Sequence, residues 1–179
     1  TLPRVISADT NLTDLVFTHA SDQLLTSHHY GRVCVWQLST SKMVAEANLG
    51  GLFDTQLALS PDDRMIAVAG LQILSPNGPS TLRVARFDGL QVVATNSFRS
   101  HIKDLIYSPD GGRLAALSNL PFVQLWNSQV RELCRTGDSS SVPVAIQFSR
   151  DGLRLLTLDQ NGDARLWDAH TGQPLGDDA

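Results

Sequence analysis

The sequence predicts an all-β fold in which one sheet-forming unit is repeated four times. Three observations predict it: four aromatic residues recur at regular spacing, a turn of the Ser-Pro-Asp type precedes them, and short apolar segments alternate with turn residues. The aromatics lie 51, 39 and 41 positions apart and are Trp36, Phe87, Trp126 and Trp167. This spacing sets a unit of about 40 residues with one insertion. A unit of this size cannot bury its own apolar face, so neighbouring copies must stack to form the core.

Each unit is expected to form four short strands in a meander. The first strand ends at a turn that carries Asp62, Asp110 or Asp151, and we interpret these aspartates as structural because such turns favour Ser, Pro, Asp and Gly. The third strand ends at the recurring aromatic. Apolar residues on both faces of the first three strands indicate a sheet between two others, and charges mark the outer fourth strand. The second strands are expected at 23–27, 65–69, 114–118 and 153–158, and outer strands at 43–47, 90–94 and 130–134.

The segments that close two of the third strands, 33–37 and 164–168, resemble the WD-repeat β-propeller family, and Trp167-Asp168 is the full Trp-Asp dipeptide. The resemblance implies a β-propeller with four consecutive four-stranded antiparallel blades. Propellers of this kind usually close with seven blades or so, and we therefore expect a segment of a roughly seven-bladed ring. The expected parts are an outer strand of a preceding or closing blade (1–11), blade 1 (12–49), blade 2 with an insertion at 70–80 (50–95), blade 3 (96–136) and an incomplete blade 4 (137–179).

The family stabilises each blade with a hydrogen-bonded set of His, Ser or Thr, Asp and Trp. Carried over by position, the Ser or Thr role falls to Thr26 and Thr157, whereas the other two units have Val68 and Ala116 there. No unit has the complete set. We therefore expect apolar packing and backbone hydrogen bonds to hold the blades together.

Composition limits the class of protein. Hydrophobic residues make up 42% and charged residues 18% of the 179 positions, and no apolar run approaches the ~18 residues that span a bilayer. These values favour a soluble protein with no membrane partner, and we expect it in the cytoplasm. A net charge of −4 with scattered arginines offers no basic stripe for nucleic acid.

Cysteine and histidine usage argues against metals and cofactors. Two cysteines are too few for a disulfide framework or a zinc site. The five histidines fall at opposite ends of the expected sheets, which excludes one compact metal site. His28 and His29 are expected in a solvent-facing turn. We predict no metal and no cofactor.

The insertion at 70–80 is the feature that does not repeat. It is rich in Pro, Gly, Ser and Asn and also carries large aliphatic residues, so it is either an extended hairpin that folds back on its blade or a partner-binding protrusion. Successive connections of an antiparallel meander lie at alternate ends. The residues expected at the insertion end as partner contacts are Tyr30, Leu71, Ile73, Leu74, Arg99 and Leu120.

The sequence carries no recognisable catalytic motif. It has no Gly-x-Ser-x-Gly elbow, no Walker-type phosphate loop and no His-Glu-x-x-His. With the family resemblance, this predicts a non-enzymatic scaffold that binds another protein or a neighbouring domain of the same chain. Two alternatives stay open: a regulatory or substrate-gating propeller of a larger kinase, protease or ATPase, and a periplasmic or secreted propeller with repeated Ser-Pro-Asp-Gly turns.

Overall fold

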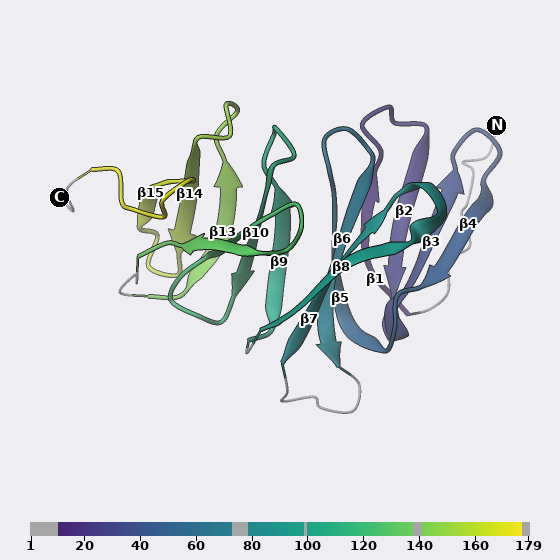
Figure 1. Ribbon diagram of the computed structural model, residues 1–179, viewed down its shortest axis with the longest axis horizontal. Coiled ribbons are helices and arrows are strands. Elements are labelled where there is room, and N and C mark those ends of the chain that lie inside the picture. Colours follow the sequence, from purple (N-terminus) through teal and green to yellow (C-terminus); the bar gives the residue numbers. More distant parts are fainter. Residues whose placement is uncertain (1–10, 73–78, 99, 138–140, 177–179) are drawn as a thin grey trace.

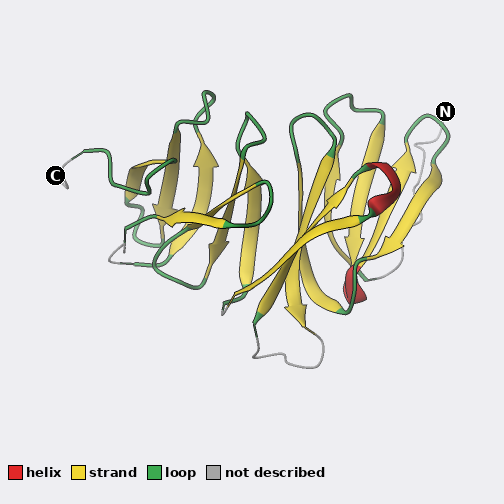
Figure 2. Ribbon diagram, viewed as in Figure 1, coloured by secondary structure: helices red, strands yellow, loops and turns green. Residues whose placement is uncertain are grey.

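The computed structural model describes residues 11–72, 79–98, 100–137 and 141–176. In these residues the chain forms four antiparallel sheets in succession, with two short 3-10 turns, η1 (His29–Gly31) and η2 (Asp88–Leu90) (Figure 1 and Figure 2). The fold is therefore all-β, as predicted. Sheet 1 contains β1 (Leu12–Phe17), β2 (Gln23–His28), β3 (Arg32–Gln37) and β4 (Lys42–Asn48); sheet 2 contains β5 (Leu52–Leu59), β6 (Met65–Gln72), β7 (Ser80–Arg86) and β8 (Val92–Phe98); sheet 3 contains β9 (Ile102–Tyr107), β10 (Arg113–Ser118), β11 (Gln124–Asn127) and β12 (Glu132–Arg135); sheet 4 contains β13 (Pro143–Phe148), β14 (Arg154–Asp159) and β15 (Ala164–Asp168).

Two features depart from a regular repeat of four-stranded sheets. Sheet 4 has three strands in the described residues, and after β15 the chain makes only an isolated bridge between Trp167 and Pro174. Strand β8 continues to Phe98, past the boundary expected at residue 95.

One hairpin geometry recurs between the first two strands of every sheet. The backbone N–H of a Ser or Thr at the turn donates to the carbonyl five residues later, in the pairs Thr18–Gln23, Ser60–Met65, Ser108–Arg113 and Ser149–Arg154. These four bonds align the sheets residue by residue. They also define a hairpin end of the molecule, which lies at the top of Figure 1.

Neighbouring sheets pack through apolar layers. Strands that are apolar on both faces cannot be stable alone, since burying a large aliphatic side chain contributes about 1.5–3 kcal/mol that a single sheet would forgo. Leu25 and Val35 of sheet 1 pack with Leu57 and Ile66 of sheet 2. Equivalent layers join sheet 2 to sheet 3 and sheet 3 to sheet 4. The core thus consists of three apolar layers, one between each pair of neighbouring sheets.

The register corrects the expected place of Phe87. In sheets 1, 3 and 4 the second residue of the second strand pairs with the tryptophan of the third strand. In sheet 2 that residue, Ile66, pairs with Ala85. Phe87 lies beyond the end of β7 in a turn and packs, half-buried, on the layer between sheets 1 and 2. The spacing of the aromatics predicts Phe87 at the position that Ala85 occupies. The two residues are two positions apart and therefore lie on the same side of the strand, so the pattern of buried residues does not distinguish them.

Residue sizes compensate within each layer. In each second strand, consider the residue that follows the partner of the tryptophan or, in sheet 2, of Ala85. Its side chain points to the next sheet. It is large where the third strand of the next sheet has alanine, and small where that strand has tryptophan. Close packing requires such a combination, because two large residues would clash and two small ones would leave a void. The combinations found in one layer are Leu25 with Ala85, Ala67 with Trp126 and Ala115 with Trp167.

The described part of the 70–80 insertion is a longer hairpin. Gly70, Leu71 and Gln72 belong to β6, and Leu71 pairs with Ser80 at the start of β7. The pairing of β6 with β7 therefore extends into both ends of the insertion. Ile73 and Leu74 lie outside the described residues.

The outer faces of sheets 1 and 4 are apolar. Leu15 and Phe17 are exposed on the side of sheet 1 away from sheet 2, and Trp36 on that side is half-buried. Leu156 and Leu158 are exposed on the far side of sheet 4. No described strand packs on either face.

The exposure of the tryptophans predicts different energetic roles. Replacing Trp126, which is 1% exposed, by alanine should lower the free energy of unfolding by about 3–5 kcal/mol, because the removed ring leaves a cavity. Trp36→Ala should cost clearly less, since the Trp36 side chain is only half-buried. Urea denaturation of both variants measures the difference, and equal losses would contradict the smaller packing role of Trp36.

Size compensation predicts a coupled pair in the layer between sheets 2 and 3. Ala67→Leu should destabilise by about 1–3 kcal/mol through overpacking. Combining it with Trp126→Phe should cost less than the sum of the two single changes, because the smaller ring makes room. Strict additivity in urea denaturation of the three variants would argue against compensation.

Candidate functional site

The three expected contact residues that the structure describes lie at one end of the molecule, on three different sheets. Tyr30 lies in η1 between β2 and β3, Leu71 near the end of β6, and Leu120 after β10. These connections lie at the lower end in Figure 1, which we call the insertion end. Leu120 is half-buried on sheet 3, where its turn is held by Arg135 stacked at 4.7 Å over Phe122. Arg99, like Ile73 and Leu74, lies outside the described residues.

An aromatic cluster lies at the insertion end of sheets 1 and 2. The ring of His29 stacks on Phe53 with 4.3 Å between centroids and 7° between planes. Tyr30 meets His29 edge-on at 6.4 Å. Tyr30 is 55% and Phe53 46% exposed. Two large exposed aromatic residues thus each contact the partly buried ring of His29.

The backbone of η1 fixes the position of Tyr30. Tyr30 has φ +70° and Gly31 has φ +75°, so two successive residues adopt the left-handed conformation. Gly31 is required there, because a Cβ atom would lie 2.1 Å from the carbonyl oxygen of Gly50. The carbonyl of Gly31 accepts a hydrogen bond from the N–H of Leu49 at 2.7 Å. The turn is therefore fastened to the connection between sheets 1 and 2, and a bulky residue is held in a strained backbone conformation.

Strand β5 presents Phe53 from the other side of the cluster. Phe53 pairs with Leu71, and the pairing of β5 with β6 is irregular between Phe53 and Gln56. Within this irregular stretch Asp54 has φ +52° and contacts His101, with 3.1 Å between Oδ2 and Nε2. The bulge thus displaces Phe53 outward and links this end of sheet 2 to sheet 3.

Phe53 is the member of this cluster that the sequence analysis did not single out. It lies in a strand whose other residues are mostly buried, and its neighbour in space, His29, is 24 positions away in the chain. A weak signal is the Gly50-Gly51 pair just before it. Glycines at a sheet entry favour an irregular strand start.

The structure corrects the expectation for His28. Its side chain is not in a solvent-facing turn but lies at the end of β2 and is 2% exposed. Its Nε2 is 3.0 Å from the hydroxyl of Thr26, which also accepts a hydrogen bond from Trp36 Nε1 at 2.9 Å. Trp167 Nε1 donates in the same way to Thr157, at 3.0 Å. The indole N–H groups of Trp36 and Trp167 thereby have acceptors, and these bonds tie the third strand to the second.

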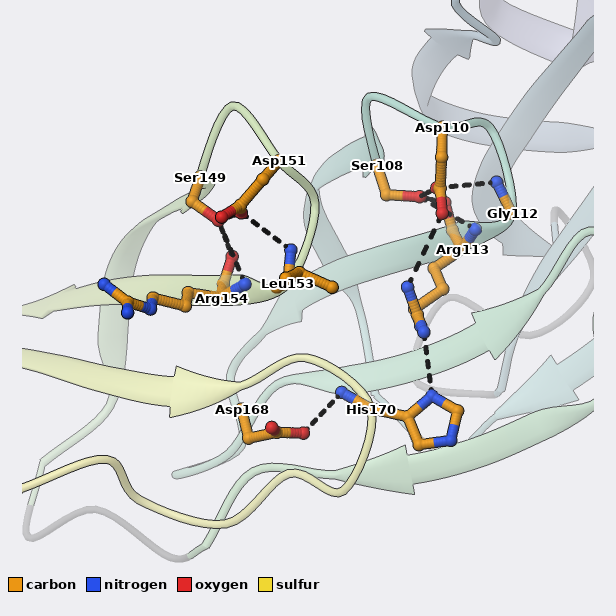
Figure 3. A network of polar contacts seen from close by, with 10 residues as sticks. All are labelled: Ser108, Asp110, Gly112, Arg113, Ser149, Asp151, Leu153, Arg154, Asp168 and His170. Carbon is orange, nitrogen blue, oxygen red and sulfur yellow. Dashed lines mark hydrogen bonds and ion pairs between the residues drawn. The ribbon is translucent and has the colours of Figure 1, made fainter.

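The hairpin end is built from turns held by serine and aspartate (Figure 3). The Ser108 hydroxyl donates to Asp110 and accepts from the backbone N–H of Arg113, and Asp110 also accepts from the N–H of Gly112. The same pattern recurs at Ser60–Asp62 and Ser149–Asp151. The serine hydroxyls hold the pKa of Asp62, Asp110 and Asp151 below its ordinary value, because they stabilise the ionised carboxylate.

Two histidines at this end each contact a side chain of a neighbouring sheet. His19 Nδ1 lies 2.8 Å from Asp63 Oδ1, and Arg113 donates to His170 Nδ1 at 2.8 Å. In the described part of the chain, no three His, Cys, Asp or Glu side chains gather so as to hold a metal ion. No helix among these residues has the length and apolarity to cross a membrane.

Comparison with known proteins finds no matching family model and no matching curated protein.

The Ser–Asp turns predict an acid-sensitive contribution to stability. A carboxyl whose pKa is lowered by folding stabilises the protein above its unfolded pKa of about 3.9, and this contribution disappears as the pH falls through the folded pKa. Asp110→Asn should therefore lower the urea midpoint at neutral pH, and its deficit relative to the native chain should shrink below about pH 4. Asp88→Asn, at an exposed position in η2, is the control. A deficit that does not change with pH would contradict the role of the charge.

Proposed function

We propose that this chain is part of a WD-repeat-type β-propeller that acts as a non-enzymatic scaffold and binds a protein or a neighbouring domain at its insertion end. The four sheets are the consecutive blades in this proposal. The recurring hairpin bonds, the tryptophan–threonine hydrogen bonds and the apolar layers between sheets support it. The apolar outer faces of sheets 1 and 4 favour further blades on both sides, as in a larger ring.

The observation that carries the binding role is the exposed aromatic cluster of His29, Tyr30 and Phe53. Large aromatic side chains supply much of the free energy of protein interfaces, whereas in water their exposed surface is unfavourable. The strained backbone of Tyr30 favours the same role. A conformation that costs about 1–2 kcal/mol persists where it positions a functional side chain.

Changing the aromatic cluster should separate binding from stability. The chain is immobilised, and proteins retained from an extract of the cells that make it are quantified by mass spectrometry. Tyr30→Asn together with Phe53→Ser should reduce the retained partner at least about tenfold, a loss of about 1.4 kcal/mol. Tyr30→Asn alone should keep or raise the urea midpoint, because asparagine tolerates a positive φ.

The matched control is His19→Ala with His170→Ala at the hairpin end. A partner that resists the aromatic changes and is lost with the histidine changes would reverse the assignment. If the purified chain catalysed a reaction that one substitution within it abolished, the protein would be an enzyme and the scaffold proposal would be refuted. A regulatory propeller of a larger enzyme would instead bind that enzyme's catalytic domain, supplied separately, through the aromatic cluster.

A further inference from the structure

A groove of about 710 Å³ lies between sheets 2 and 3. This volume falls within the range of sites for small organic molecules, about 300–1,000 Å³. The carbonyl of Met65, in the groove, accepts the hairpin bond from Ser60, so the groove lies near the hairpin end and the aromatic cluster lies at the opposite end. The groove is lined by Met65, Arg86 and residues 93–95 of sheet 2, and by Ser128, Gln129 and Arg131 in the turn between β11 and β12 of sheet 3.

The floor of the groove is apolar and lies on the face of sheet 2 that is turned to sheet 3. Met65 and Ala94 pack there on the buried cluster between the two sheets. Arg86 pairs with Met65 across β6 and β7, and directly opposite residues of an antiparallel pair share a face of the sheet. Arg86 therefore extends from the same face as Met65. The carbonyl of Val130 accepts a hydrogen bond at 3.0 Å from the amide of Asn96 in β8, which holds the turn of sheet 3 against sheet 2.

Each wall of the groove carries one arginine. Arg86 on sheet 2 and Arg131 on sheet 3 are exposed, and neither guanidinium makes an ion pair within the described residues. No acidic residue of the described chain lines the groove. A guanidinium group stays charged at physiological pH. The groove is therefore a positively charged site for which the protein supplies no counter-charge.

The charge of the groove favours a phosphoryl group over a carboxylate. A phosphate monoester carries a charge of about −1.5 to −2 at pH 7 and three strong acceptor oxygens, which matches two guanidinium groups that approach from different walls. A carboxylate carries one charge and has two oxygens. The floor formed by Met65 and Ala94 favours an apolar group beside the charge. A small phosphate ester with an aromatic or aliphatic body satisfies both the walls and the floor.

We propose that this groove binds a small phosphate monoester, with its phosphoryl group between Arg86 and Arg131 and its apolar group on Met65 and Ala94. The bound ester joins sheets 2 and 3, because each sheet contributes one guanidinium group. The site adds a small ligand to the scaffold function proposed above and does not depend on the aromatic cluster.

The test follows the methionine methyl groups of the full chain by NMR, with isotope label in these groups alone. The chain has two methionines, Met65 in the floor of the groove and Met43, which is 42% exposed on β4 of sheet 1. Met43→Leu assigns the two signals. Titration with phenyl phosphate should shift the Met65 signal with a Kd below about 1 mM, and the Met43 signal should stay in place.

Two further ligands and two variants separate the parts of the site. Phenyl sulfate, which has the same ring but one charge, and inorganic phosphate, which lacks the ring, should each bind more than about tenfold more weakly than phenyl phosphate. Arg86→Gln with Arg131→Gln should raise the Kd for phenyl phosphate more than about tenfold. Arg150→Gln, at an exposed arginine of sheet 4's hairpin turn, should leave it unchanged.

Three results would each overturn the proposal: a Kd for phenyl phosphate above about 1 mM, equal binding to the double arginine variant, or equal binding of phenyl sulfate. Inorganic phosphate that binds as tightly as phenyl phosphate would overturn the role of the apolar floor. A pentapeptide with a central phosphotyrosine that binds more than about tenfold more tightly than phenyl phosphate would assign the groove to a phosphorylated protein segment instead. Urea midpoints and an unchanged Met43 signal establish that the variants fold.

Discussion

The packing of one sheet against the next is the constraint on which the whole molecule depends. Each sheet is apolar on both faces, and its strands bury little within the sheet itself. Stability therefore arises between repeats, and each sheet is stable only as long as its neighbours are present. This explains why Trp126, between two sheets, is almost fully buried, whereas Trp36, on the first sheet, is not.

Because the packing between sheets supplies the stability, the connections at the ends of the sheets can vary. The hairpin end repeats the same Ser–Asp turn in sheets 2, 3 and 4, and in sheet 1 Thr18 donates to Asp22 instead, because every sheet needs a reversal between its first two strands. At the insertion end each connection is different: a 3-10 turn in sheet 1, a lengthened hairpin in sheet 2 and a turn held by a cation–π contact in sheet 3. Irregular loops on a regular scaffold are where binding residues commonly lie.

Much of the fold could be predicted from the sequence, because the strands and turns follow from local sequence patterns. The position of the turns and the order of the strands follow from short segments such as Ser108–Asp110. Phe87 was misplaced because a repeat marker can move by two residues without changing its side of the strand. His28 was misjudged because its burial depends on Thr26 and Trp36 rather than on its immediate neighbours. The stack of His29 on Phe53 joins two sheets, and a contact of that kind leaves no local pattern.

The alternation of large and small residues in the layers gives the repeats a fixed order of succession. Genes for repeat proteins gain and lose units by recombination. Such an event leaves the packing between sheets intact only if any unit can follow any other. Here, losing sheet 2 would put Leu25 of sheet 1 into one layer with Trp126 of sheet 3, two large residues where the native layers pair large with small. By the same logic, the exposed Leu156 of sheet 4, which occupies the position of Leu25, fits a following sheet with a small residue opposite it. The repeats of this chain are therefore not interchangeable modules, because each one is matched in size to the sheet that follows it.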